Sequence, residues 1–188
     1  VMFFWQPRIR LLADLARITV FPDDDAALAR VLHLPAFELD LVEVKRIIHH
    51  VSRTSPTDLS ASLRVFLSRP EQNVSFDHAT VERLKAALDY LGHMQIQLRE
   101  GVKFGEVIRT AVDDLFYEEI LKGDLDSGIR DARNLHLFDR LLSDIQEVEE
   151  KLEAAPSPEN LIEHLEHAFI HYAQQEQEAP FAEAEEGE

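Results

Sequence analysis

The residues best suited to metal chemistry are three histidines near the end of the chain. His164, His167 and His171 recur at helical spacing within an arc of about 60°, and imidazoles are common ligands of zinc and nickel. His164 and His171 would lie about 10.5 Å apart along a helix axis, too far to share one ion easily. His167 and His171 could chelate as a pair, but a pair does not complete a four-ligand site. The pattern favours a solvated helix shoulder, with His167 and His171 as the metal candidates.

A second candidate is the polar loop that begins at Gly123. Gly123 and Gly128 have the separation found in a phosphate-binding loop, but the Lys and Ser/Thr that should follow are missing. The same loop has alternating aspartates before Gly128, as a calcium loop does, yet Leu135 stands where the bidentate glutamate belongs. We therefore interpret it as an ordinary loop that leads into a helix.

No other set of residues predicts catalysis. The 36 acidic residues contain no carboxylate pair or Ser/His/Asp arrangement that can be singled out, and cysteine is absent. The run Asp23–Asp25 could attract a cation, but such a run more often caps a helix and complements its dipole. We assign no catalytic, cofactor-binding or metal residue to this chain.

Composition and charge describe a folded, acidic domain. The 188 residues are 45% hydrophobic and 29% charged, and no apolar run reaches the roughly 20 residues of a membrane helix. The net charge is −17, but residues 1–70 hold 9 basic and 8 acidic residues, against 10 and 28 in residues 71–188. Any contact with nucleic acid is therefore expected in the first 70 residues. We expect a cytoplasmic protein with no membrane contact.

Helical periodicity runs through the chain and predicts an all-α, irregular multi-helix domain of about 7–9 helices. The expected helices begin at Pro7, after Asp23–Asp25, after Asp40 with Glu43 as a capping box, after Thr57, and after Ser75 or Asp77; the last of these runs to about Arg99 and ends at Gly101. Further helices are expected over 104–113, 129–152 and 157–175, with a turn at Phe116 and Tyr117.

Two patterns stand in the first 40 residues. The first is Phe3, Phe4, Pro7, Ile9, Arg10, Leu11 and Leu12, and the second is Pro22, Asp23, Asp24, Asp25, Ala27, Leu28, Arg30, Val31, Leu32 and Pro35. Together they resemble the UvrD/Rep/PcrA-type superfamily 1 DNA helicases. In that family this pattern lies where motor subdomain 2A meets its helical insertion, 2B. The stretches 104–120 and 133–135, and the final helix before an acidic stretch, resemble later parts of the insertion by their helical pattern.

The resemblance implies a division of the chain and a role for it. Residues 1–20 would be an edge helix from the end of 2A, 21–176 the 2B-like insertion, and 177–188 an acidic, disordered tail. The chain would then be a fragment that positions DNA or a partner and catalyses nothing by itself. The parent would be an ATP-dependent helicase in replication or repair, with ATP and magnesium bound by its motor subdomains.

One departure from the family concerns the turn after Pro35. The family commonly carries a Gly-hydrophobic-Gly turn here, whose backbone amides approach duplex phosphates, whereas this chain has Glu38 and Asp40 in the two glycine places. A carboxylate adds bulk and repels phosphate. Lys45, Arg46 and Arg53 on the next helix are the remaining candidates for DNA contact, and they could equally form an exposed polar face.

Two other classes of function stay open. The acidic balance after residue 70 also fits an all-helical protein–protein interaction module without DNA contact, and a helical metalloprotein would use His167 and His171. The expected partners are the motor subdomains of the same polypeptide, DNA, or a separate protein.

Overall fold

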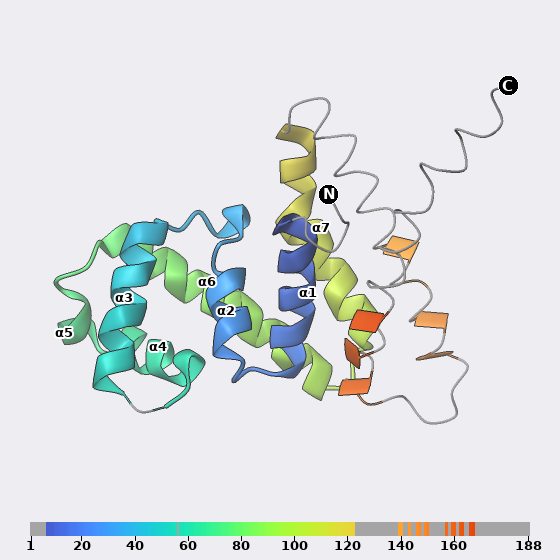
Figure 1. The fold of residues 1–188 in the computed structure, drawn as a ribbon, viewed down its shortest axis with the longest axis horizontal. Helices are drawn as coiled ribbons and strands as arrows, with labels where there is room; N and C mark the ends of the chain where they lie inside the picture. The colour runs from blue at the N-terminus through green and yellow to red at the C-terminus, as the bar shows by residue number, and fades with distance from the viewer. Residues whose placement is uncertain are drawn as a thin grey trace, which may run out of the picture.

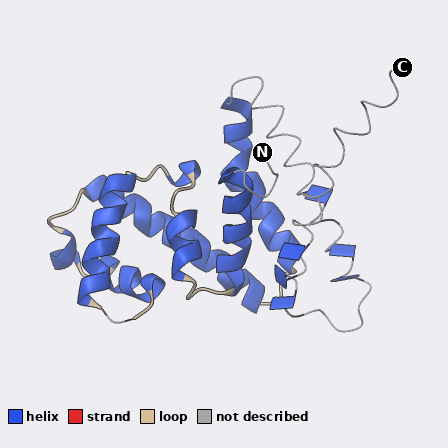
Figure 2. Ribbon diagram, in the orientation of Figure 1, coloured by secondary structure: helices blue, strands red, loops and turns tan. Residues whose placement is uncertain are grey.

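The fold is all-α in a computed structural model of the chain. The structure describes residues 7–55 and 57–122, and in addition residues 139–140, 143, 146–147, 149–150, 157, 159–160, 162–163 and 166–167. Figure 2 shows helices and loops but no strand in this described part, which confirms the predicted fold class.

Seven α-helices and one short 3-10 helix follow one another in the continuous described region. They are α1 (Pro7–Val20), α2 (Asp25–Val31), η2 (Pro35–Phe37), α3 (Leu41–Thr54), α4 (Leu59–Leu67), α5 (Pro70–Asn73), α6 (His78–Arg99) and α7 (Phe104–Lys122). The long helix α6 crosses the molecule, with α3 and α4 at its beginning and α1 and α7 toward its end (Figure 1). The sequence predicted most of these helices but not η2 or α5.

One apolar core joins these helices. Leu15, Ile47, Leu63 and Ile108 are fully buried, and they come from α1, α3, α4 and α7. Because α1 contributes to the same core as the later helices, it is an integral part of this fold. The division of a parent protein at residue 20 remains a prediction.

Aspartates begin four of the helices, as the sequence led us to expect for three of them. Asp24 accepts a hydrogen bond from the Ala27 N–H at 2.9 Å and caps α2. Asp40 caps α3, and Asp77 caps α6. The prediction for α4 is wrong: its cap is Asp58 rather than Thr57.

Asp25 shows that the run Asp23–Asp25 has a second use. Its carboxylate accepts a hydrogen bond from the backbone N–H of Leu59 at 2.7 Å, at the first residue of α4. A helix N-terminus has unpaired N–H groups and a partial positive charge, so a carboxylate stabilises it. The acidic run therefore serves two helix starts in the structure.

Two arginine pairs hold α2 against α1. Arg30 on α2 donates two hydrogen bonds, of 2.7 and 2.8 Å, to the buried carboxylate of Asp14 on α1. Arg17 donates to Asp24 at 2.6 Å and also to Glu166 at 2.8 Å. Planar guanidinium and carboxylate groups match in shape, so these bonds also fix the angle between the helices.

The ends of α6 and α7 show one confirmed and one wrong prediction. Helix α6 ends at Arg99, just before the expected Gly101, whose φ of 91° lies in the left-handed region that favours glycine. Its N–H bonds the Leu98 carbonyl, and the N–H of Val102 bonds the Gln97 carbonyl. The expected turn at residues 116–117 is absent, because α7 continues through it to Lys122 with Phe116 buried.

Described residues from the C-terminal part contact this framework. Arg109 on α7 pairs with Asp139 and donates to Ser143 at 3.2 Å, and Ile162 is buried in the core. Glu149 accepts hydrogen bonds from the backbone N–H groups of Phe104 and Gly105 at the start of α7. The residues that the structure describes between 139 and 150 and between 159 and 167 have helical backbone.

Among the described residues, no helix combines the length and apolar character needed to cross a membrane.

Candidate nucleic-acid interface

Helix α3 presents basic side chains on its outer face, opposite its buried apolar residues, and Val42 in its first turn is exposed on the same outer face. Val44, Ile47 and Val51 are buried. Residues 45, 46, 49 and 53 fall within an arc of about 100° on the opposite side, at 100° per residue. Their side chains are exposed, so the three candidates Lys45, Arg46 and Arg53 share one surface with His49.

Arg46 is held in place more firmly than its exposure suggests. Its guanidinium donates a 2.5 Å hydrogen bond to the buried carboxylate of Glu43, one turn earlier on α3. The same guanidinium lies over the ring of Phe76, with its carbon 5.3 Å from the ring centre. Arg46 therefore forms a cation–π pair next to an ion pair, and its charge is partly compensated.

A hollow of about 450 Å³ lies beside this face. The residues that line it are Arg46, His49, His50, Arg53, Thr54 and Phe76. The candidates Arg46 and Arg53 thus meet at one hollow, whereas Lys45 lies outside its lining on the same exposed face of α3. No carboxylate belongs to the lining that the structure describes.

Aromatic packing forms the floor of the hollow. The Phe76 ring stands edge-to-face against Phe66 at 5.3 Å and against His50 at 5.5 Å between centroids. Phe66 is 1% exposed and belongs to the core. The hollow is therefore built on the packing between α3, α4 and the start of α6.

The sequence did not predict Phe76, His49 or His50 as site residues. The i, i+4, i+8 spacing of Lys45, His49 and Arg53 is a signal that could have found His49. Nothing local could have found Phe76, because it reaches the hollow only through the packing of the α6 start against α3.

The turn before α3 is fixed by residues of α6. The Phe37 ring packs edge-to-face on Tyr90 at 6.4 Å, and Arg83 donates a 3.0 Å hydrogen bond to the carbonyl of Glu38. Tyr90 in turn donates to Asp114 at 2.7 Å, and its burial, followed by this hydrogen bond, raises the pKa of Tyr90.

The two acids of this turn, Glu38 and Asp40, have different backbone conformations. Glu38 has φ 50° and ψ 37°, the left-handed conformation that glycine adopts without strain. Asp40 has φ −69°, which any residue can adopt, and its carboxylate accepts from the N–H of Val42 at 2.9 Å and of Glu43 at 3.2 Å. The amides that a phosphate could use at this helix start are therefore occupied by Asp40.

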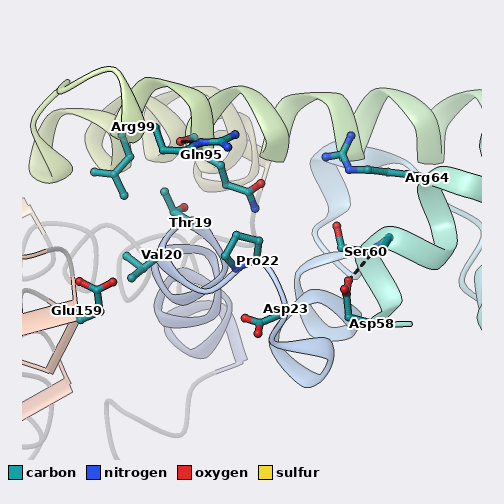
Figure 3. A pocket seen from close by; sticks show the side chains of 12 residues that line it. Thr19, Val20, Pro22, Asp23, Asp58, Ser60, Arg64, Gln95, Arg99 and Glu159 are labelled. Atoms are coloured by element: carbon teal, nitrogen blue, oxygen red, sulfur yellow. Dashed lines mark hydrogen bonds between the residues drawn. The ribbon is translucent and has the colours of Figure 1, made fainter. Parts of the chain in front are cut away.

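A second hollow, of about 520 Å³, lies between α1, α4 and α6 (Figure 3). Its charged lining mixes Asp23, Asp58 and Glu159 with Arg64 and Arg99. Several polar groups there already have partners: Asp58 caps α4, and Arg64 donates to the Leu88 carbonyl at 3.1 Å. Acids and bases face the same space, so the charge does not select an anion or a cation.

The metal candidates are mostly beyond what the structure describes. His167 is an exposed helical residue, while His164 and His171 lie outside the described residues. The loop with Gly123 and Gly128 lies outside them too. Among the described side chains, no three His, Asp or Glu residues are placed to hold one metal ion.

No protein-family model matches this sequence, and no curated protein matches it either.

Proposed function

We propose that this chain is a helical accessory domain that positions nucleic acid, of the kind that UvrD/Rep/PcrA-type DNA helicases carry as their 2B insertion. The observation that carries the proposal is the exposed basic face of α3, where Lys45, Arg46 and Arg53 lie together. The left-handed backbone of Glu38 gives further support, because it keeps the conformation of a glycine in the turn where the family has one.

The basic face suits the backbone of a duplex. Lys45 and Arg53 are eight residues apart, or about 12 Å along the helix axis. Duplex DNA presents about one negative charge per 1.7 Å of its axis, so a face of this length meets several phosphates. Such contacts depend on charge rather than on base sequence.

The proposed contact differs from that of the family in one respect. Asp40 occupies the amides of Val42 and Glu43, and its negative charge stands at the beginning of α3. Phosphates would therefore be bound by the side chains of α3 and not by the backbone of the turn. Binding through side chains alone should be weaker and more sensitive to salt than binding that also used backbone amides.

The proposal assigns no chemical step to this chain. In an intact parent helicase, ATP and magnesium would act in motor subdomains outside the insertion, and the helical domain would orient the duplex as it is unwound. The purified chain should then show no nucleotide turnover above that of a contaminant control.

A protein-interaction module is the second candidate, and exposed apolar side chains favour it. Val42 at the start of α3 is 72% exposed, and Val74 before α6 is 83% exposed. Together with a net charge of −17, these side chains suit a basic or apolar protein partner.

Salt-dependent binding of labelled duplex DNA to the full chain separates the two candidates. We expect affinity to fall steeply as salt increases. The pair of substitutions Lys45→Glu and Arg53→Glu should lower affinity at least tenfold and reduce the slope of log affinity against log salt by about 2. These residues are better choices than Arg46, whose replacement by glutamate would place two carboxylates together at Glu43.

Lys103→Gln is the control. Glutamine is used because Lys103 lies 3.9 Å from Glu150, so a glutamate would place two carboxylates together. Lys103 follows the far end of α6, whose 22 residues span about 33 Å from the α3 side of the molecule. The variant also makes the net charge more negative but should leave the affinity for duplex DNA within about twofold. Absence of salt-sensitive binding, or an equal loss in the control, contradicts the proposal and supports the interaction module.

A further inference from the structure

The hollow beside α3 has a size and a lining that the proposed duplex contact does not explain. The basic face and this open hollow of about 450 Å³ share Arg46, His49 and Arg53, but the hollow also includes the Phe76 ring, which a contact with duplex phosphates does not use. Four of the six residues that line it are arginine or histidine, in a chain with 36 acidic and 19 basic residues. A lining without carboxylates in so acidic a protein selects an anionic ligand.

Besides its charged side chains, the hollow has a flat surface, made by the Arg46 guanidinium and the Phe76 ring. The Arg46 guanidinium lies over the Phe76 ring and donates a hydrogen bond to Glu43. Phe76 is supported by Phe66 in the core and by His50. Guanidinium planes and aromatic rings are the surfaces on which unpaired bases stack, so Arg46 and Phe76 together form a stacking platform.

Anion-selecting side chains surround that platform. Arg53 and His49 are exposed, one turn apart on α3, and both line the hollow. Thr54 adds a hydroxyl at the end of the helix, where it donates to the His50 carbonyl at 3.1 Å. A ligand with a planar part and an adjacent negative group would stack on the platform and reach the side chains of Arg53 and His49.

We infer that the hollow receives one unpaired nucleotide of a DNA strand, with its base against the Arg46–Phe76 wall and its phosphate beside Arg53 and His49. The inference rests on the proposed function, because it uses the same face of α3. It narrows the substrate to DNA in which a duplex continues into a single strand: Lys45 and the exposed face contact the duplex, and the first unpaired nucleotide enters the hollow.

The test compares two labelled probes with the full chain: a blunt duplex, and the same duplex with a short unpaired thymidine overhang. A stacked base contributes about 1–3 kcal/mol, so the overhang should raise affinity about tenfold. Phe76→Leu should abolish this gain, so that the overhang and blunt probes bind this variant with affinities within about twofold of each other. Lys103→Gln should preserve the gain.

A second variant, His49→Ala, tests the hollow without changing a residue that packs on the core. Phe76 packs on the core, so Phe76→Leu is accepted only if its thermal midpoint stays near that of the wild type. His49→Ala removes an exposed side chain that lines the hollow and should reduce the gain by at least threefold.

The outcomes distinguish the inference from the proposed function. If the blunt duplex binds in a Lys45- and Arg53-dependent way but the overhang adds nothing, the inference is wrong and the proposed function stands. An overhang gain that survives in both Phe76→Leu and His49→Ala also overturns the inference. If neither probe binds with salt sensitivity, both ideas fail.

Discussion

The carboxylate of Glu43 accepts a hydrogen bond from the backbone N–H of Asp77, with 2.9 Å between the two atoms. Asp77 is the residue that caps α6, so a side chain of α3 satisfies a donor at the start of another helix. The second oxygen of Glu43 holds Arg46. One buried acid thus fastens α3 to α6 and positions a residue of the candidate interface.

Glu43→Ala should lower the free energy of unfolding by about 1–3 kcal/mol, because it leaves the Asp77 N–H and the Arg46 guanidinium without this acceptor. Glu43→Gln keeps an oxygen for Asp77 and should cost less than Ala. Chemical denaturation measures both. Glu82→Ala, at an exposed position on α6, is the control and should change stability by less than about 0.5 kcal/mol. Equal losses at Glu43 and Glu82 would contradict this role.

Acid stability should depend on Asp24. The N–H of Ala27, and then the Arg17 guanidinium, hold the pKa of Asp24 below its ordinary value of 3.8. A lowered pKa stabilises the fold above the ordinary value, and this contribution is lost as pH falls through the folded value. Asp24→Asn keeps a capping oxygen but cannot titrate.

The thermal midpoint of Asp24→Asn should therefore fall less steeply than that of the wild type between about pH 5 and pH 2. At pH 7 the variant should be less stable than the wild type by about 1 kcal/mol or less. If the thermal midpoints of the two proteins fell equally over this pH range, Asp24 would not contribute to acid stability in this way.

Glu149 should act in the opposite direction. Burial raises its pKa above the ordinary value of 4.5, against the effect of the Phe104 and Gly105 N–H groups, and one of its oxygens is buried without a hydrogen-bond partner. An acid with a raised pKa favours the folded state less as pH rises through the ordinary and then the folded value.

Glu149→Gln should consequently be more stable than the wild type at pH 7, and the difference should vanish below about pH 4. Gln keeps an oxygen for the α7 amides and removes the cost of burying a charge. Thermal unfolding at several pH values measures this difference. A destabilised Glu149→Gln at pH 7 would show that the charge itself is needed at the α7 start.

Placing glycine at both acidic positions of the turn tests the proposed likeness to the helicase insertion. Glu38→Gly removes a left-handed non-glycine residue, and Asp40→Gly frees the amides of Val42 and Glu43. The double variant should bind duplex DNA about three- to tenfold more tightly, since phosphate can then approach the backbone. Loss of the Asp40 cap should also lower the stability of the double variant by about 1 kcal/mol. Glu38→Gly should offset part of this loss, because glycine adopts the left-handed conformation without strain.

Glu38→Gly alone is the control for strain: it should stabilise the fold slightly and change DNA affinity little. If the double variant binds DNA no better than the wild type, the turn does not face the duplex.

The local signals in the sequence predicted the helices well where a single residue decides the outcome. Pro7, Asp40 and Gly101 mark helix ends in the structure as their backbone chemistry requires. The cap predicted at Thr57 is instead formed by the neighbouring Asp58. The turn expected at Phe116 is helical, because burial of that ring outweighs its weak helix propensity.

Contacts between distant helices could not be predicted in the same way. The capping box expected at Asp40 and Glu43 formed only in part: Asp40 caps α3, but Glu43 turns away to Asp77, 34 positions later in the chain. The sequence pointed to the basic residues of α3, but Phe76 joins them only through tertiary packing. A pattern within one helix carries no information about which ring a later loop will bring to it.

The most direct measurement of the central claim, that the outer face of α3 contacts DNA, is an amide NMR titration of the full chain with the overhang-bearing duplex. We expect the largest shift changes in residues 41–54 and at Phe76, with little change at the end of α6 near Lys103, and the changes should disappear when salt is raised. Shift changes confined to other helices, or none at DNA concentrations that saturate binding, would contradict the account.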